Sequence, residues 1–480
     1  MTEHSKSRRT LFIAGGTGTL IVAALTAVVL APRVGAADAA RPPAEQPGTA
    51  AEVDPWGAGQ DAPVTFSGDV ASILQRRCQA CHQEGSIAPM SLVTYEEARP
   101  WGPLIRDRVT KRIMPPWHLD RDRGIQAFAN DRSLTDEEIA TLVRWVDAGM
   151  PEGDPAELPP PVEWPDGRNF ALYERLGPPD LIIRSDPYDV PATGQDAWWR
   201  PTVETGVERP RWVRAAEIKP SYPDGRKVVH HTLVTLLQSE EGITGLASSA
   251  AGAVGSPGLL TEWAIGKVGE IYPEDTGKLL LPGSRIRFEV HYSTMAGIEV
   301  PDNQVELGLW FYPEDVTPKY RTILRFFNIA GDSELEIPPH TLTTHSNTFV
   351  IPAPARLESF QPHMHMRGRG MSMEALYPDG RKELLNIVSA FQWKWHNNYI
   401  YAPEAAPLLP AGTVLQFTAW HDNTASNPAN PDPDQYVTWG DRTVDEMAHA
   451  WVGITYLEQA DFERLATERA AAADRVAANR

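Results

Sequence analysis

Cysteine is the scarcest feature of this chain, because its 480 residues contain only two, Cys78 and Cys81. The rest of the chain is therefore without disulfides, and its folded regions must depend on their hydrophobic cores. A blue-copper centre, which needs a cysteine thiolate, is excluded outside that pair. The chain also lacks an excess of cations, since 44 Lys and Arg face 63 Asp and Glu. The net charge of −19 argues against nucleic acid or an anionic membrane as a partner.

Proline and tryptophan, by contrast, are plentiful, at 43 and 15 residues. Proline disfavours helix interiors and tryptophan favours strands, so this composition favours loop-rich β domains over helical bundles. Apolar residues make up 42% of the chain, which is normal for soluble globular domains with substantial cores. A chain of 480 residues is long enough for three domains of ordinary size.

The N-terminus has the pattern of an export signal. Arg8 and Arg9 precede an apolar run from Thr10 to Leu30, and Val34-Gly35-Ala36 resembles a small-residue cleavage site. The apolar run is also long enough to span a bilayer. Residues 1–40 are therefore expected to be either a cleaved signal peptide or an N-terminal membrane anchor. In both cases the basic end stays inside the cell, so we expect a periplasmic or other extracytoplasmic location.

A compact helical domain is expected at residues 60–153. Its last helix is the best marked, with Thr135 as N-cap, Glu138 completing a capping box, and Gly149 and Pro151 as stop signals. One stripe of this helix is apolar and consists of Ile139, Leu142, Val143 and Val146. Residues 154–178 are proline-rich, which indicates a semi-rigid linker.

Beyond the linker, short strand-like runs alternate with turn residues, a spacing typical of β-sandwiches. The stretch is too long for one sandwich, so we expect two jelly-roll-like all-β sandwiches, at 179–335 and 336–458, after the small all-α domain. We also expect a flexible loop at 239–258 and a solvated helical tail at 459–480. The runs that carry the pattern are Lys227–Leu237, Arg285–Tyr292, Val305–Tyr312, Ser346–Val350 and Val414–Trp420.

The run Cys78-Gln79-Ala80-Cys81-His82 has a specific chemistry. In an exported chain the two thiols of such a motif add to the vinyl groups of a haem, and the adjacent histidine binds the iron. A redox dithiol would not need His82, and a zinc site would need two further thiols or histidines close by, which are not well placed. The motif therefore predicts covalently bound haem c and a cytochrome c domain at residues 60–153.

The second axial ligand of that haem should follow later in the domain, and methionine is the usual choice. Met114 lies on the proline-stiffened run Ile113-Met114-Pro115-Pro116-Trp117 and is the favoured candidate. Met90 follows His82 by only eight positions and is expected to be a packing residue. His118 is a less favoured ligand.

Three histidine features occur in the strand-rich part: the dyad His230-His231, then His291, and His363 with His365. Each histidine alone would ordinarily be a hydrogen-bonded surface or core residue, but five in three clusters favour a metal. Residues two apart share a face of a strand, so His363 and His365 can meet on one ion. Adjacent residues face opposite ways, so the dyad can share an ion only where its strand is bulged or distorted.

These motifs resemble those of the copper type II, ascorbate-dependent monooxygenases, the family of the peptidylglycine- and dopamine-hydroxylating enzymes. The resemblance covers residues 181–456, and the motifs follow in the family's order. His230-His231 is similar to its histidine pair, Glu289-Val290-His291-Tyr292 to its third histidine, and Gln361-Pro362-His363-Met364-His365 to its His-x-His. Asp445-Glu446-Met447 is similar to the segment that carries its methionine ligand.

The resemblance implies two copper ions. His230, His231 and His291 would hold an electron-transfer copper, and His363, His365 and Met447 would hold the copper that binds dioxygen. Imidazole and thioether ligands suit copper, and a soft methionine favours Cu(I). Four methionines nearer in sequence to the His-x-His compete with Met447, and most are expected to be packing residues. They are Met364, Met366, Met371 and Met373.

The chain departs from the peptide-amidating members of that family in its expected substrate pocket. Those members carry an arginine that binds the substrate carboxylate two residues before His-x-His, where this chain has Gln361. His449 and Trp451 stand where those members place an asparagine and a tyrosine that contact substrate. Without a charged anchor the pocket should not select a peptide carboxylate, and Trp451 indicates a more apolar or aromatic substrate.

The sequence thus favours a copper-dependent monooxygenase that hydroxylates a C–H bond of a small organic substrate with dioxygen. The fused haem would deliver electrons from an external donor in place of ascorbate. One alternative is a non-enzymatic periplasmic electron-transfer cytochrome with a copper-binding or docking β module. Another is a copper carrier or sensor.

Overall fold

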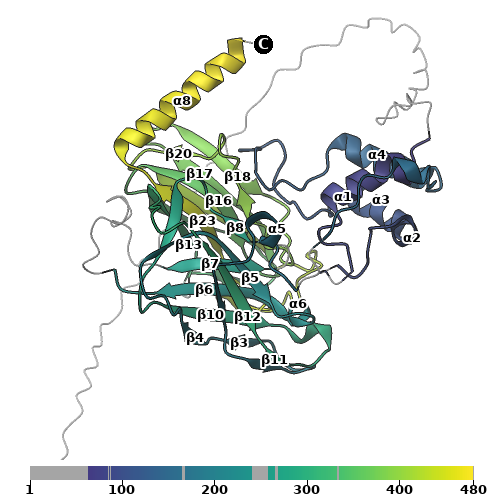
Figure 1. The fold of residues 1–480 in the computed structure, drawn as a ribbon, viewed down its shortest axis with the longest axis horizontal. Coiled ribbons are helices and arrows are strands. Elements are labelled where there is room, and N and C mark those ends of the chain that lie inside the picture. Colours follow the sequence, from purple (N-terminus) through teal and green to yellow (C-terminus); the bar gives the residue numbers. More distant parts are fainter. Residues whose placement is uncertain are drawn as a thin grey trace, which may run out of the picture. The chain divides into compact units, whose positions relative to one another are not determined.

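The computed structural model describes residues 63–478 apart from 85, 87, 165–167, 241–257, 265, 266, 268, 332 and 333. The signal or anchor expected at 1–40 lies outside the described residues, and so does most of the loop expected at 239–258. In the described part of the chain, no helix combines the length and the apolar character needed to cross a membrane. Most of the described chain is β-sandwich with few helices, as the composition predicted (Figure 1).

Residues 64–150 form a helical region with its own core. Thr135 caps the last helix: its hydroxyl accepts from the Glu138 N–H, and the Glu138 carboxylate accepts from the Thr135 N–H. The predicted capping box is therefore confirmed. Ile139, Leu142 and Trp145 of that helix are buried in the core. The elements are η1 (Phe66–Val70), α1 (Ala71–Arg77), α2 (Tyr95–Ala98), η2 (Arg99–Trp101), α3 (Gly102–Thr110) and α4 (Asp136–Asp147).

The expected linker contains two short helices, η3 (Pro155–Glu157) and α5 (Tyr173–Leu176). Its first half contacts the helical region, because the Gln75 side chain donates to the Pro160 carbonyl at 2.7 Å. Its second half packs on the first sandwich through Phe170, whose ring meets that of Trp310 edge-on at 5.8 Å. The linker is thus bound at both ends.

The first sandwich packs a five-stranded sheet against the strands β1, β12 and β5 of a larger sheet. Phe288 and Val234 from one layer and Ile218 and Leu307 from the other are buried between them. The smaller sheet has the order β3 (Ala197–Trp199), β10 (Arg285–Tyr292), β6 (Val229–Leu237) and β7 (Leu259–Ala264), with β4 (Thr202–Glu204) also beside β10. The partners are β1 (Leu181–Arg184), β12 (Val305–Phe311) and β5 (Arg211–Pro220), and α6 (Gly225–Val228) leads into β6.

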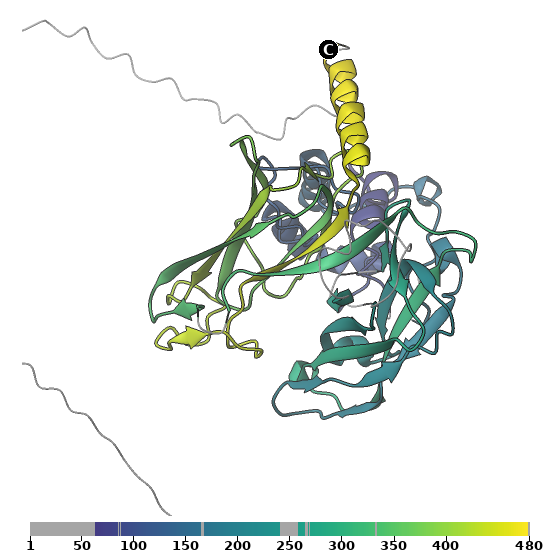
Figure 2. The same ribbon diagram turned by 90° about the vertical axis from the view of Figure 1, so that its left-hand side faces the viewer.

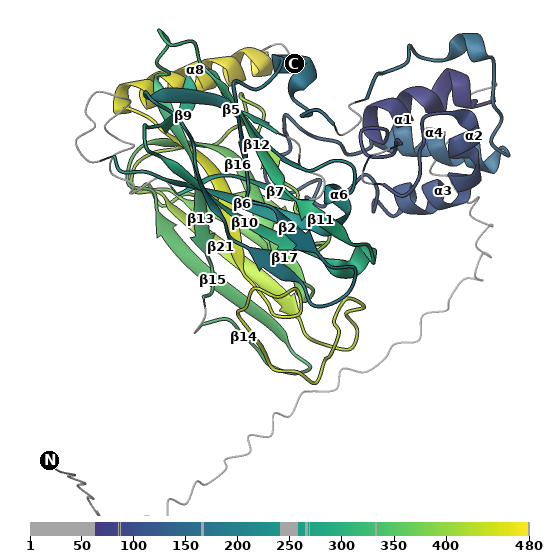
Figure 3. The same cartoon turned by 60° about the horizontal axis from the view of Figure 1, so that its bottom comes forward.

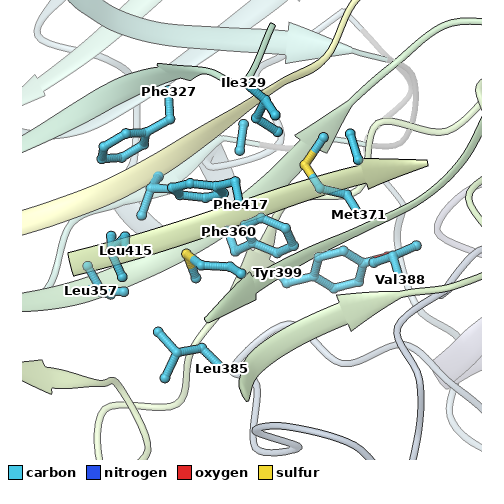
Figure 4. Packing of buried hydrophobic residues seen from close by; sticks show 14 of the residues in the cluster. Phe327, Ile329, Leu357, Phe360, Met371, Leu385, Val388, Tyr399, Leu415 and Phe417 are labelled. Atoms are coloured by element: carbon cyan, nitrogen blue, oxygen red, sulfur yellow. The ribbon is translucent and has the colours of Figure 1, made fainter. Parts of the chain in front are cut away.

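The second sandwich packs a four-stranded sheet against β13, β23 and β16 (Figure 3). Its core is rich in aromatic rings, with Phe327, Phe360 and Phe417 fully buried among methionine and leucine side chains (Figure 4). The four-stranded sheet has the order β15 (Leu342–Val350), β21 (Val414–Asp422), β17 (Gly368–Leu376) and β18 (Lys382–Val388). The facing strands are β13 (Tyr320–Asn328), β23 (His449–Tyr456) and β16 (Ala355–His363), with β19 (Tyr399–Ile400) and β20 (Leu408–Leu409) beside β16.

One ten-stranded sheet runs through both sandwiches in the order β1-β12-β5-β9-β13-β23-β16-β19, with β8 (Glu270–Ile271) and β20 at its sides. The link is narrow, because β9 (Thr276–Leu280) meets β13 in parallel at Thr276↔Tyr320 and Gly277↔Arg321. The rest of β13, from Thr322 to Asn328, pairs with β23 of the second sandwich. β13 lies inside the range expected for the first sandwich, so strand pairing crosses the expected boundary at 335/336.

The remaining elements lie at the margins of the sandwiches. The helix expected in the tail is present as α8 (Gln459–Ala478), which Figure 2 shows extending from the end of β23. Arg469 of α8 donates to the Pro403 carbonyl at 3.0 Å. The small elements are β2 (Tyr188–Val190) paired with β11 (Val300–Asn303), β14 (Glu336–Ile337) paired with β22 (Val437–Thr438), and η4 (Thr294–Ala296).

Candidate functional site

The histidine dyad lies at the start of β6, beside His291 near the end of β10. His291 pairs with His231, but the next residue, Tyr292, pairs with Val229, so the register skips His230. An extra residue of this kind turns two successive side chains toward the same side of a sheet. The distortion that the dyad requires in order to share an ion is therefore present.

Three imidazole nitrogens meet at this distortion. The Nδ1 atom of His231 lies 3.2 Å from that of His230 and 3.4 Å from that of His291. Tetrahedral ligands with metal–nitrogen bonds of about 2.0 Å lie about 3.3 Å apart, which matches this spacing. Within the described residues, these three are the one group of three His, Cys, Asp or Glu side chains whose ligand atoms all lie within 4.8 Å of each other. We call them the first cluster.

Asp196 fixes the tautomer of His291. Its Oδ2 accepts from the His291 Nε2–H at 3.0 Å, which leaves the lone pair of the ring on Nδ1, toward the other two histidines. The same hydrogen bond holds the pKa of Asp196 below its usual range. Trp198 supports the ring from the side, stacked on His291 at 4.3 Å between centroids and 9° between planes.

Burial keeps His230 and His231 neutral. It lowers the pKa of His230 to about 4 and that of His231 well below its ordinary value, with the neighbouring imidazoles adding to the effect. Neutral imidazoles have the lone pairs that a metal ion needs. The first cluster is thus a set of three preformed nitrogen ligands.

His363 and His365 lie at the end of β16 and just after it, with ring centroids 5.3 Å apart. The Nδ1–H of His365 donates to the Asp445 carbonyl at 3.1 Å, so the lone pair of that ring is on Nε2. The Nδ1 of His363 shares a hydrogen bond of 3.2 Å with the Nδ1 of His396. Both rings therefore have Nε2 as the atom left for a metal.

Two further histidines complete what we call the second cluster, which consists of His363, His365, His396 and His449. The His449 ring stacks on His363 at 4.4 Å, and Trp451 lies 5.1 Å from His363. The resemblance described above implied that His449 and Trp451 belong to this site. His396 had not been predicted, because it lies in the connection between β18 and β19 with no ligand-like spacing to another histidine.

The two clusters adjoin each other. The ring centroids of His231 and His363 are 6.2 Å apart, and those of His396 lie 5.8 Å from His230 and 6.0 Å from His231. All five histidines predicted as metal ligands are therefore brought to one place. His396, a member of the second cluster, lies beside both histidines of the dyad.

Met447, the sixth predicted ligand, belongs to a segment tied beside the second cluster. The buried Glu446 carboxylate accepts the backbone N–H of His365 at 3.0 Å, of Arg367 at 2.6 Å and of Met447 at 3.3 Å. The Met447 carbonyl accepts from His421 Nε2–H at 3.2 Å. Met447 is partly exposed, whereas Met364, Met371 and Met373 are packed in the core, as expected of them. Met366 is also partly exposed.

The cysteine pair follows α1 in a helical turn. The backbone N–H groups of Cys81 and His82 both donate to the Cys78 carbonyl, at 3.1 and 3.0 Å. No disulfide joins the two cysteines, and burial raises the pKa of the Cys78 thiol to about 12. Two thiols three residues apart, with a histidine after the second, fit the covalent attachment of a haem.

Two of the candidate distal ligands line one cavity of about 340 Å³, bounded by Met114, His118 and the core residues Val109 and Ile139. Burial lowers the pKa of His118 to about 4, and its Nε2 atom is buried without a partner. Met90 instead packs against the helical core, as expected of a packing residue. Met114 and His118 therefore share one cavity, whose lining does not include Cys78, Cys81 or His82.

No family model matches this chain, and no curated protein is similar to it. Among solved structures, the infectious bursal disease virus Gx strain matches at 7% identity and a TM-score of 0.16, covering 57% of this chain and 72% of that chain. The VP2 subviral particle of the same virus matches at 8% identity, again with a TM-score of 0.16 and the same coverage. A TM-score this low supports no argument about fold or function.

Proposed function

We propose that this protein is an exported copper-dependent monooxygenase, similar to the copper type II, ascorbate-dependent enzymes, with a fused c-type haem as its electron donor. It would hydroxylate a C–H bond of a small organic substrate with dioxygen. The observation that carries the proposal is the skipped register at His230, through which three Nδ1 atoms gather at metal-ligand spacing. Copper held by the two clusters would supply one-electron redox chemistry and the binding of dioxygen.

In this proposal the first cluster relays electrons. Three imidazoles in a fixed arrangement hold an ion with little rearrangement, and Asp196 keeps the His291 ring in the tautomer that presents Nδ1. The nearly parallel indole of Trp198 restricts rotation of the same ring. These contacts support a site that changes its charge without changing its ligands.

The second cluster would hold the dioxygen-binding ion through the Nε2 atoms of His363 and His365, with Met447 as third ligand. Asp445 and His396 hold the opposite nitrogens of the two rings. His449 and Trp451 would then limit the approach to His363. Aromatic walls and the uncharged Gln361 favour an apolar substrate over a carboxylate.

For the helical region we propose a cytochrome c domain, followed by two jelly-roll-like sandwiches. Cys78 and Cys81 would attach the haem through thioether bonds, His82 would be the proximal ligand, and Met114 the distal one. Attachment of this kind takes place outside the cytoplasm, which agrees with the signal or anchor proposed for residues 1–40. An external donor would reduce the haem.

Oxygen uptake tests the proposal. Copper-loaded holoprotein, with its haem reduced, should consume dioxygen in the presence of members of a panel of alkylbenzenes and release hydroxylated products. The His365→Ala variant should not, while His340→Ala should behave as wild type, because His340 lies at the surface beside Asp434. Copper bound without substrate-dependent uptake would instead favour a copper carrier, and failure to bind copper would favour an electron-transfer module.

A further inference from the structure

The chain after Met114 leaves the helical region and packs on the second sandwich. We call residues 117–130 the docking segment. Its backbone is bound to the β18 and β19 strands and to the turn after β19, so it is fixed along its length. The hydrogen bonds are Asp120 N–H to Ile387 O (3.0 Å), Ile125 N–H to Leu385 O (2.8 Å), Ala129 N–H to Ile400 O (2.8 Å) and Ala402 N–H to Ala127 O (3.0 Å).

Side chains add to this attachment. The Asn130 amide donates to the Asn398 carbonyl at 2.8 Å and accepts from the Ile400 N–H at 3.0 Å. Asp120 accepts from the N–H and the hydroxyl of Ser389, at 2.9 and 2.7 Å. Hydrogen bonds to a charged carboxylate are stronger than neutral ones, so this end is firmly held.

Trp117 begins the docking segment, three residues after Met114. Its indole is 9% exposed and meets the ring of Tyr399 edge-on, with 4.8 Å between centroids. Phe128 packs against both rings, at 5.7 Å from Trp117 and 6.0 Å from Tyr399. Tyr399 itself is 1% exposed, so this contact is dry.

Tyr399 is only three residues after His396. His396 is 5% exposed and shares a hydrogen bond with His363. Its ring centroid lies 5.8 Å from that of His230 and 6.0 Å from that of His231. One short piece of chain, from 396 to 399, thus joins the aromatic contact with Trp117 to both histidine clusters.

We infer that Trp117, Tyr399 and the short chain from Tyr399 back to His396 form the path by which electrons would pass from a bound haem to the copper sites. The inference rests on the proposed function, because it needs both metals. Each transfer would move one electron from a bound ferrous haem to a bound Cu(II) ion, leaving ferric haem and Cu(I), and no bond would form or break. The docking segment already joins the helical region to the second sandwich.

A second route by which electrons could reach the clusters runs through α6, and the test must distinguish it from the path through Tyr399. Burial raises the pKa of the Cys81 thiol, and the charges of Arg132 and Arg226 oppose that rise. Arg226 belongs to α6, which leads directly into β6 and the dyad. Electrons that entered through α6 would reach His230 first and would bypass Tyr399.

The test uses holoprotein with haem and copper counts checked in every variant. Under anaerobic conditions the haem is reduced by a laser-generated flavin semiquinone, and its reoxidation by Cu(II) is followed in the haem absorbance and by the copper EPR signal. Trp117→Leu and Tyr399→Leu should slow haem reoxidation about tenfold, equivalent to about 1.4 kcal/mol in the barrier. Phe128→Leu removes a ring from the same group but not from the path, and should transfer electrons at the wild-type rate.

Two controls separate this path from a loss of structure. Tyr399→Phe and Trp117→Phe keep an aromatic ring and should restore most of the transfer rate. If the two residues had only a structural role, the transfer rates of the variants would instead fall in step with their free energies of unfolding. Amide exchange at Ala129 and Ala402 reports whether the docking segment stays in place. His396→Gln should slow transfer with the haem potential unchanged.

Wild-type reoxidation rates in Trp117→Leu and Tyr399→Leu would overturn the path. So would a slow rate in Arg226→Gln alone, which would assign entry to α6. A wild-type protein that binds haem but no copper would contradict the proposed function itself, so the two failures are distinguishable.

Discussion

The first cluster turns three Nδ1 atoms toward one another, whereas in the second cluster the Nδ1–H of His365 is bound to the Asp445 carbonyl and the Nδ1 of His363 faces only that of His396. One is a distorted strand pair that gathers its ligands by itself. The other draws on β16, on the connection before β19 and on the 445–447 segment. The first cluster lies on two adjacent strands, so strand pairing fixes the positions of its ligands. The second cluster is assembled from three segments, so a further ligand can enter between them. Under the proposed function, this difference in construction would suit the two copper ions to different tasks.

Removing a ligand should give the largest effect and separate the clusters. His231→Ala and His365→Ala should each hold one copper per haem in place of two and lose hydroxylation, because each removes a different ion. Copper and haem analysis of the purified proteins checks this. His340→Ala, an exposed control, should keep both ions and change the free energy of unfolding by no more than about 0.5 kcal/mol. Loss of both ions from either variant would contradict independent sites.

Asp196→Asn should affect the first cluster alone. An amide cannot orient His291 as a carboxylate does, so copper affinity there should fall about 10- to 100-fold, the usual effect of removing such a partner. Competition with a Cu(I) chelator measures both sites. Asp434→Asn, which alters the carboxylate beside the exposed His340, is the matched control. Equal weakening at both clusters would mean that Asp196 does not act through His291.

Glu446→Ala should destabilise the second cluster, because Glu446 connects the segments from which that cluster is built. It leaves the backbone N–H groups of His365, Arg367 and Met447 without their acceptor, which should cost about 1–3 kcal/mol in the free energy of unfolding. Urea denaturation of the copper-free protein measures this. Copper at the first cluster should be unchanged. An unaltered free energy of unfolding would show that water replaces the carboxylate at no cost.

The smallest effect is expected from Trp198→Leu. Loss of the stacked ring on His291 should cost about 0.5–1.5 kcal/mol beyond the lost apolar area, with both coppers retained. Thermal unfolding of the copper-free protein gives the comparison. Trp101→Leu changes an exposed tryptophan of the helical region and serves as control. If both variants unfold alike, the stacking does not stabilise the first cluster.

The sequence predicted those features of the fold and of the site that depend on residues close together in the chain. The Thr135–Glu138 capping box lies within one turn, and the two adjacent histidines predicted the strand distortion that a shared ion would require. The core packing of Met364, Met371 and Met373 was also predicted.

Contacts distant in sequence had no such signal. Asp196 reaches His291 across 95 positions, and His396 reaches His363 across 33. Trp117 meets Tyr399 only because the docking segment pairs with strands of another region. Strand pairing likewise places β13 with β23 rather than within the range expected from the spacing of strand runs. These relations depend on tertiary packing, which residue type and spacing do not encode.

Anomalous diffraction at the copper and iron edges, from crystals of the haem-bearing protein saturated with copper, tests the central claim most directly. The account predicts two copper peaks, one among the Nδ1 atoms of the first cluster and one at the Nε2 atoms of His363 and His365. It also predicts one iron peak bonded to His82. Absence of copper from both clusters, or a single copper shared between them, would contradict it.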